Sequence, residues 1–159
     1  MYLLTKSETL AAGATVNLSG VTNPSPVIDG KPDTFIETPT LAPTLTIDLG
    51  SAKVIDTLWF KGENLNDYTI AASDDNTTFT DLSADITVPS HGHSYTKFTN
   101  ATAYRYWRLT FSARGESDPQ YRLYQVFPMR SLLDLNNNIN RPLHYRKTTP
   151  RDGLSLIHI

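Results

Sequence analysis

The sequence predicts an all-β protein with the two-sheet architecture of a jelly-roll β-sandwich. Short segments alternate apolar and polar residues, turn residues separate them at regular spacing, and no segment of helical length repeats at about 3.6 residues. Alternation of this kind places one face of each strand in a core and the other in water, as antiparallel sandwiches require.

The first predicted strands lie on either side of ambiguous N-terminal residues. A strand is expected at Tyr2–Lys6, and Thr15–Ser19 alternates as a half-buried strand does. Asn23–Pro26 indicates a turn, because its two prolines fix φ and remove two backbone donors. Asp29 and Gly30 then turn the chain again.

Three strands with clear core residues follow. Thr44–Leu49 alternates and is expected to end at Gly50, Val54–Lys61 is mostly apolar, and Tyr68–Ser73 again alternates. The residues of these strands that we expect in the core are Leu45, Ile47, Leu49, Ile55, Leu58, Phe60, Tyr68, Ile70 and Ala72.

The second half of the chain continues in shorter segments. Its strongest strand is Tyr104–Ser112, which is rich in aromatic residues and includes Leu109 as a further core candidate. The other segments are, in order, a hairpin-like turn at Asp74–Asn76, a returning strand at Thr78–Leu82, a short strand at Ile86–Val88, a flexible loop at Ser90–Ser94, an edge strand at Tyr95–Phe98, a polar loop at Ala113–Gln120 and a last strand at Arg122–Met129.

The sequence predicts one folded domain and two further segments. Residues 1–129 are expected to form the sandwich, and residues 130–153 a linker or the start of a truncated following element. Residues 154–159 read LSLIHI, for which CTG-TCT-CTT-ATA-CAC-ATC is one coding sequence. This resembles the adapter of transposase-based sequencing libraries, so we expect read-through and a metagenomic origin; the alternative is a genuine short apolar strand.

Composition excludes several functional classes. With 159 residues the chain can bury one core, and its net charge of -2 gives no electrostatic reason to bind nucleic acid or an anionic membrane. The absence of cysteine excludes disulfides and thiol chemistry. No apolar run approaches membrane-spanning length and no signal peptide is seen, so we expect no membrane insertion.

Five stretches in order carry a family resemblance. They read DGKPDTF, TLTIDLG, VIDTLWFKG, DYTIAASDDNTTFTDL and YRYWRL. Together, over residues 10 to 128, the chain resembles discoidin domains (coagulation factor V/VIII type C) and related galactose-binding carbohydrate-binding modules. The resemblance implies a galactose-binding-like jelly-roll β-sandwich.

The resemblance also implies a structural Ca²⁺ site in the Asp-Gly turn. Carried over to this chain, its ligands are the Asp29 side chain, the Pro26 and Lys31 carbonyls, the Thr34 hydroxyl and carbonyl, and Gln125, where the family has Glu. Hard oxygen ligands from one tight loop suit Ca²⁺, although the exchange to Gln removes one negative charge. The alternative is that Asp29 and Thr34 only hydrogen-bond the turn backbone.

The resemblance further implies a glycan site in loops at one end of the sandwich. Aromatic rings stack on the apolar face of a pyranose, while planar polar side chains bind its hydroxyl groups. We expect Phe35 and Trp59 in the core, and Trp107 in either place. The candidate loops are Lys61–Asn66, Ser90–Tyr95 and Ala113–Tyr121, and the candidate ligand-binding residues are Glu63, Asn64, His91, His93, Tyr95, Arg114, Asp118 and Tyr121. For each residue the alternative is a solvated loop side chain.

No pattern in the sequence indicates catalysis. The spacing of His91 and His93 suits Zn²⁺ poorly, and adjacent Asp74 and Asp75 are more typical of a turn than of a pair of catalytic acids. The sequence has no Gly-x-Ser-x-Gly motif, phosphate loop or Cys nucleophile. We therefore expect a protein that is not an enzyme.

These observations predict a non-catalytic adhesion module within a longer surface or phage tail protein. Its partners would be a glycan or cell-surface receptor and other virion subunits, and its location extracellular or on a virion surface. One alternative is a structural spacer or assembly domain of a virion tail or baseplate that binds no sugar. The other is an accessory module of a truncated glycoside-active enzyme. The fold does not choose among them.

Overall fold

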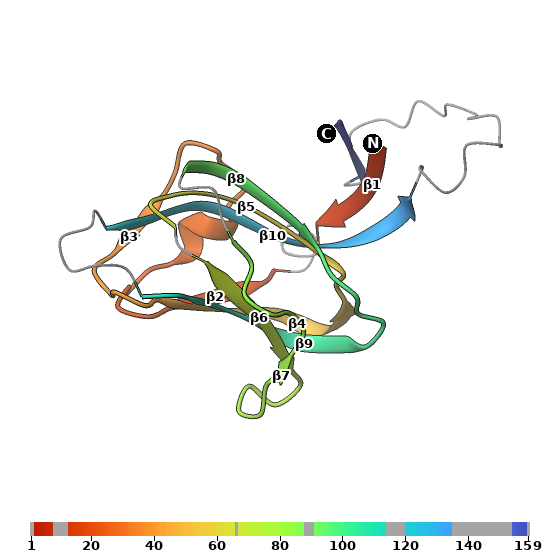
Figure 1. The fold of residues 1–159 in the computed structure, drawn as a ribbon, viewed down its shortest axis with the longest axis horizontal. Coiled ribbons are helices and arrows are strands. Elements are labelled where there is room, and N and C mark those ends of the chain that lie inside the picture. Colours follow the sequence, from red (N-terminus) through yellow and green to blue (C-terminus); the bar gives the residue numbers. More distant parts are fainter. Residues whose placement is uncertain are drawn as a thin grey trace.

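Two antiparallel sheets pack face to face in the computed structural model (Figure 1). The structure describes residues 2–7, 13–65, 67–87, 91–113, 120–134 and 154–158. The only helical element in these ranges is the 3-10 helix η1 (Ser25–Ile28), which lies against β10 and β2. This arrangement confirms the predicted all-β sandwich.

The sheet that we name sheet A has the spatial order β11-β1-β10-β5-β8, and β3 also pairs with β10. Its strands are β1 (Tyr2–Ser7), β3 (Ile36–Thr38), β5 (Thr57–Glu63), β8 (His91–Lys97), β10 (Tyr121–Asp134) and β11 (Leu154–His158). Sheet B has the order β2-β4-β9-β6-β7. Its strands are β2 (Thr15–Leu18), β4 (Thr44–Val54), β6 (Tyr68–Ser73), β7 (Thr80–Asp81) and β9 (Ala103–Phe111).

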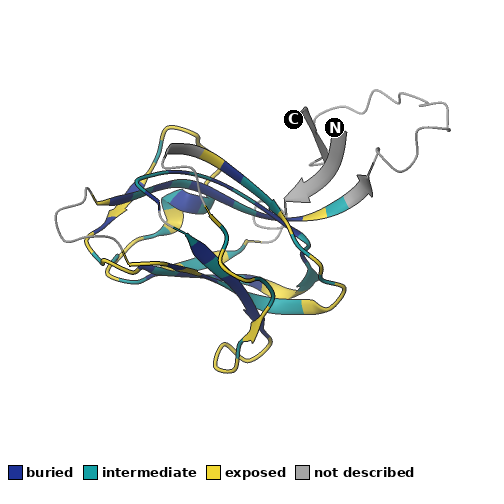
Figure 2. Ribbon diagram, in the orientation of Figure 1, coloured by how far each residue is buried: buried dark blue, intermediate teal, exposed yellow. Residues whose placement is uncertain are grey.

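The core lies between the two sheets and is formed by the inward-facing residues of both (Figure 2). Leu45 and Ile47 are 0% exposed, and Ile70 and Leu109 are 1% exposed, as the alternation predicts. The other predicted core residues of β4, β5 and β6 are buried as well. Within the described residues, no helix has the length and hydropathy needed to cross a bilayer.

Two predicted strand boundaries are wrong because backbone pairing continues past turn-forming residues. β4 does not end at Gly50, which adopts a positive φ of 73° at an irregularity in the pairing with β9, and the strand continues to Val54. Residues 91–94 are not a flexible loop, because all of β8 pairs with β5. In the predicted strand at 86–88, Ile86 forms an isolated bridge with Tyr68, and Val88 lies outside the described residues.

The last described strands lie beyond the predicted end of the sandwich. β10 continues past Met129 to Asp134, where we expected a linker or a following element to begin. β1 pairs with this extension on one side and with β11 on the other. The expected origin of residues 154–159 in an adapter concerns the nucleotide sequence, so it stays a prediction.

Candidate functional site

Pairing within sheet A brings the described ends of the three predicted loop segments to one end of the sandwich. β5 pairs with β8 so that Glu63 lies opposite His91, and with β10 so that Glu63 lies opposite Arg122. Asn64 Nδ2 also donates a hydrogen bond of 3.3 Å to the Gln120 carbonyl. The stems of all three loops therefore meet around the end of β5.

A pair of aromatic rings, one exposed and one half-buried, lies beside these stems. Phe35, just before β3, is 44% exposed, and its ring centroid lies 5.2 Å from that of Tyr124 on β10. The Lys61 ammonium lies 4.5 Å from the Tyr124 centroid and donates to the Pro32 carbonyl at 3.1 Å. The Arg122 guanidinium carbon lies 5.4 Å from the Phe35 centroid, so the two rings form an aromatic pair with a cation over each.

Charged side chains border this ring pair. Arg122 Nε donates to Glu37 Oε1 at 2.5 Å, and Arg122 Nη1 donates to Glu63 Oε2 at 3.4 Å. The Tyr124 hydroxyl donates to Glu63 Oε1 at 3.0 Å. We name the whole group the Phe35–Tyr124 surface, and it consists of Phe35, Glu37, Lys61, Glu63, Arg122 and Tyr124.

The surroundings of this surface raise two pKa values. Partial burial, followed by the hydrogen bond to Glu63, raises the pKa of the Tyr124 hydroxyl. The hydrogen bond to Glu37 raises the pKa of the Arg122 guanidinium. At neutral pH the surface therefore has a phenol donor and a permanent cation, while Glu37 and Glu63 supply acceptors. These groups can donate hydrogen bonds to a ligand's hydroxyl oxygens and accept hydrogen bonds from its hydroxyl hydrogens.

The predicted ligand-binding residues take different positions. Glu63 belongs to the Phe35–Tyr124 surface, and Asn64 follows it. His91 opposes Glu63 by its backbone, and His93 and Tyr95 lie farther along β8. Tyr121 is 0% exposed, and its hydroxyl donates to the Ser112 carbonyl at 2.6 Å, so the prediction that it contacts a ligand is wrong. Arg114 and Asp118 lie outside the described residues.

The three aromatic residues that we considered as core or sugar-platform residues also differ in their burial. Trp107 is buried and belongs to the core. Trp59 is half-buried on the outer face of sheet A, where its ring stacks on Phe127 at 5.2 Å and lies 5.2 Å from the His93 ring. Phe35 is exposed, so the expectation of a core position is wrong for both Phe35 and Trp59.

Sequence reasoning missed Phe35, Arg122 and Tyr124 as surface residues, although alternation could have found them. Phe35 and Glu37 flank the buried Ile36, so they share the outer side of β3. Arg122 and Tyr124 likewise flank the buried Leu123 on β10. Period-two reasoning applied to these residues places all four on one surface.

The five residues predicted to hold a metal do lie together. The Gln125 side chain contacts Pro26, Asp29 and Lys31, and the Thr34 hydroxyl contacts Asp29 and Lys31. The Asp29 carboxylate accepts hydrogen bonds from the Lys31 backbone, Gln125 and Thr34; these outweigh its partial burial and lower its pKa.

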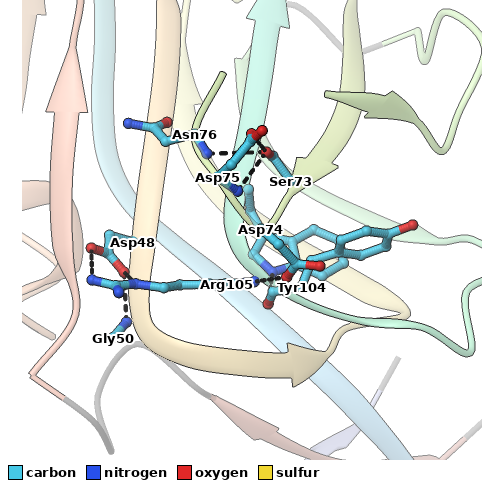
Figure 3. A network of polar contacts seen from close by, with 9 residues as sticks. Asp48, Gly50, Ser73, Asp74, Asp75, Asn76, Tyr104 and Arg105 are labelled. Atoms are coloured by element: carbon cyan, nitrogen blue, oxygen red, sulfur yellow. Dashed lines mark hydrogen bonds and ion pairs between the residues drawn. The ribbon is translucent and has the colours of Figure 1, made fainter. Parts of the chain in front are cut away.

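A second polar cluster lies in sheet B (Figure 3). Asp48 accepts a bidentate pair of hydrogen bonds from Arg105, both at 2.8 Å, and a third from the Gly50 amide at 2.7 Å. Asp74 accepts from the Arg105 amide at 3.3 Å. These carboxylates are therefore engaged by cations and backbone donors.

Asp75 completes this cluster by holding the β6–β7 turn. It accepts hydrogen bonds of 2.8 Å each from the Ser73 hydroxyl and the Thr77 and Thr78 amides. This is the arrangement of a turn former and not of a catalytic acid. Within the described residues, no three His, Cys, Asp or Glu side chains are grouped as metal ligands would be.

The chain matches a model of a known protein family. The F5/8 type C model described as a NedA-like, galactose-binding domain matches residues 26–109, more than half of the chain. No curated protein sequence matches.

Solved structures share the fold at low sequence identity. Chitosan-binding module 1, from a chitosanase/glucanase of Paenibacillus sp. IK-5, is 23% identical, with a TM-score of 0.63 over 77% of this chain and 98% of that one. The family 32 carbohydrate-binding module of Clostridium perfringens NanJ, in complex with galactose, is 15% identical, with a TM-score of 0.65 over 79% and 99%. A Ruminococcus gnavus GH29 fucosidase in complex with fucose is 20% identical, with a TM-score of 0.66 over 79% of this chain and 26% of that one.

Proposed function

Because the chain belongs to the F5/8 type C family of NedA-like, galactose-binding domains, we propose that it is a non-catalytic module that binds a glycan or another cell-surface ligand. The observation that carries this proposal is the Phe35–Tyr124 surface. It combines the exposed ring of Phe35 and the half-buried ring of Tyr124 with donors and acceptors, which is the chemistry that a sugar ring and its hydroxyl groups require.

The position of this surface supports the proposal. It lies on β3, β5 and β10, which are held in place by the core, and it adjoins the stems of the three loops. Its polar groups bond to one another across strands, so a ligand hydroxyl can replace one such bond without opening the backbone ladder. Binding sites built on rigid strands hold their groups in a fixed geometry.

A glycan array probed with the full chain tests the proposal. The array should include β-galactosides, fucosylated glycans and chito-oligosaccharides, because structures with this fold are bound to such sugars or are named for them. We expect a discrete set of bound glycans. Retention of no glycan by the folded wild-type chain would contradict the proposal.

The Tyr124→Ala variant locates the site. Its matched control is Tyr106→Ala in sheet B, since Tyr106 is also half-buried and has a cation, Arg105, 4.9 Å from its ring centroid. We expect Tyr124→Ala to lower the array signal by a factor of roughly ten or more, because the variant loses one stacking contact and one hydrogen bond. Tyr106→Ala should leave the signal unchanged, and equal signals from both variants would place the site elsewhere.

We further propose that the module serves a longer protein that acts outside the cell. Two of the similar structures favour an accessory role in a carbohydrate-active enzyme. One is a module from a chitosanase/glucanase. The other is a fucosidase in which the matching region covers 26% of the chain. The expected phage tail or virion parent remains the second candidate. The coding sequence around this gene distinguishes them, because a glycosidase domain in the same reading frame supports the first and adjacent tail genes support the second.

A further inference from the structure

The side-chain amide of Gln125 lies in a cage of oxygen atoms formed by the loop after η1. Gln125 Nε2 donates to the Pro26 carbonyl and to Asp29 Oδ1, each at 2.8 Å, and to the Lys31 carbonyl at 2.9 Å. Its own oxygen accepts from the Gly30 amide at 3.0 Å. The Gln125 residue is only 2% exposed, so the amide is a buried connection between β10 and this loop.

The orientation of the amide follows from these partners. Three acceptors surround one end of the group and a backbone donor faces the other, so the nitrogen must face the acceptors. A reversed amide would bring its oxygen against three oxygens and its N–H groups against the Gly30 N–H. The two N–H hydrogens of Gln125 are therefore shared among three acceptors.

The residues in this arrangement do not fit a resident calcium ion. Ca²⁺ takes six to eight oxygen ligands at about 2.3–2.6 Å. An ion at that distance from the Pro26, Asp29 and Lys31 oxygens would overlap the Gln125 nitrogen and face its N–H hydrogens. To ligate with its oxygen, Gln125 would have to rotate its amide and lose the bond from Gly30.

The charge of the cage leads to the same result. Asp29 supplies its one carboxylate, while Gln125 is neutral where a Glu would supply the second. The Thr34 hydroxyl lies 2.9 Å from Asp29 Oδ2 and 2.9 Å from the Lys31 carbonyl, so its single hydrogen is used inside the loop. An amide donor satisfies one carboxylate and two carbonyls without adding the two positive charges of an ion.

We propose that the Gln125 amide occupies the place of a metal ion, so that this module folds and remains stable independently of calcium. The loop of residues 26–34 is then connected to β10 by the hydrogen bonds of the Gln125 amide, in addition to the core packing of Val27, and not by an ion. The exchange is reversible in principle, since Gln125→Glu restores an oxygen where the nitrogen lies and adds a second carboxylate. That variant should require calcium.

Thermal unfolding in EDTA and in millimolar CaCl₂ tests this proposal directly. The wild-type chain should have the same melting temperature in both buffers. Gln125→Glu should melt about 5 °C or more below wild type in EDTA, because it places two carboxylates and two carbonyls together, and calcium should restore the loss. Gln120→Glu makes the same chemical change on an exposed side chain outside the cage, and it should behave as wild type in both buffers.

Each other outcome overturns part of the proposal. A wild-type melting temperature that rises with calcium or falls with EDTA shows that an ion occupies the cage. A Gln125→Glu variant that ignores calcium, or that stays unfolded in both buffers, shows that the cage cannot exchange the amide for an ion. Because the readout is unfolding, the result does not depend on whether the chain binds a glycan.

Discussion

The polar clusters of the two sheets differ in what their side chains bind. In the sheet B cluster, Asp48 and Asp75 accept hydrogen bonds from backbone amides. Asp48 on β4 also accepts from the Arg105 side chain on the neighbouring β9. On the Phe35–Tyr124 surface, Glu63 accepts hydrogen bonds from the side chains of Arg122 and Tyr124. The first cluster fixes turns, and the second connects side chains across a surface.

This difference separates a structural cluster from a candidate binding surface with similar composition. A carboxylate that satisfies backbone donors cannot leave them without exposing unpaired amides, which costs stability. A carboxylate bonded to a neighbouring side chain can exchange that partner for a ligand hydroxyl at little cost. On the Phe35–Tyr124 surface, the ring of Phe35 is 44% exposed and adds an apolar contact beside these carboxylates.

The largest expected effect comes from removing the arginine of each cluster. Arg122→Ala should lower the affinity for the glycan found on the array by roughly tenfold or more, because charge-assisted hydrogen bonds are the strongest that such a surface offers. Its melting temperature should change by about 2 °C or less, since the ion pairs are exposed. Titration calorimetry and thermal unfolding measure the two quantities.

Arg105→Ala is the matched control for this prediction. It should lower the melting temperature through the loss of the bidentate contact with Asp48 and leave the glycan affinity unchanged. The contrast between the sheets fails if both variants lose affinity equally, or if Arg105→Ala alone weakens binding.

A smaller effect distinguishes two tyrosines of β10 that face opposite sides. Tyr121→Phe removes the donor to the Ser112 carbonyl and should lower the free energy of unfolding by about 1 kcal/mol, with no change in affinity. Tyr124→Phe should instead weaken binding and leave unfolding nearly unchanged, since its hydroxyl bonds to the exposed Glu63. Urea unfolding and calorimetry of both variants measure this, and reduced affinity in Tyr121→Phe would contradict its assignment to the core.

The smallest effect is a pH dependence that belongs to the sheet B cluster. The Thr78 and Thr77 amides lower the pKa of Asp75 below its ordinary value of 3.8, and Arg105 lowers that of Asp48. A lowered folded-state pKa contributes stability that is fully present above 3.8 and is lost as the pH falls through the folded value. Wild-type stability should therefore decline below pH 4.

Asp75→Asn tests the source of this decline. The variant cannot titrate at this position, so its stability should fall less steeply between about pH 4 and 2. At pH 6 its melting temperature should lie within about 2 °C of wild type, because an exposed amide oxygen can still accept from the turn. Urea midpoints measured across this pH range compare the slopes, and parallel curves would assign the decline to other carboxylates.

The fold was predictable because alternation is a local signal. Leu45, Ile47 and Ile70 lie at alternate positions of their segments, which places them on one face of a strand, and all three are buried. Only the C-terminal part of β8 was predicted, as the edge strand Tyr95–Phe98. Its first residues were predicted as a loop, because His91, Gly92 and His93 have low strand propensity. These residues are in a strand because they pair with β5, which is distant in sequence, and local composition does not reveal such a pairing.

The glycan site stays a prediction, both in its location and in its residues. The described ends of the three predicted loop segments do lie together around the end of β5, which follows from the antiparallel pairing of neighbouring strands. Tyr121 and Phe35 were misplaced because residue type was given more weight than strand phase: a loop tyrosine was expected outside and a phenylalanine inside. The role of Gln125 could not be derived from spacing, since its partners lie more than ninety positions away along the chain.

The buried side-chain amide of Gln125 bears on the solution conditions in which such a module stays folded. Occupancy of a metal site obeys mass action and varies with the surrounding ion concentration. A side chain, in contrast, is always present at the same effective concentration, because the backbone carries it. On the proposal that the Gln125 amide replaces an ion, the connection between β10 and its neighbouring loop should persist in polyanionic gels and secretions that sequester divalent cations. A connection made through a bound ion should weaken there.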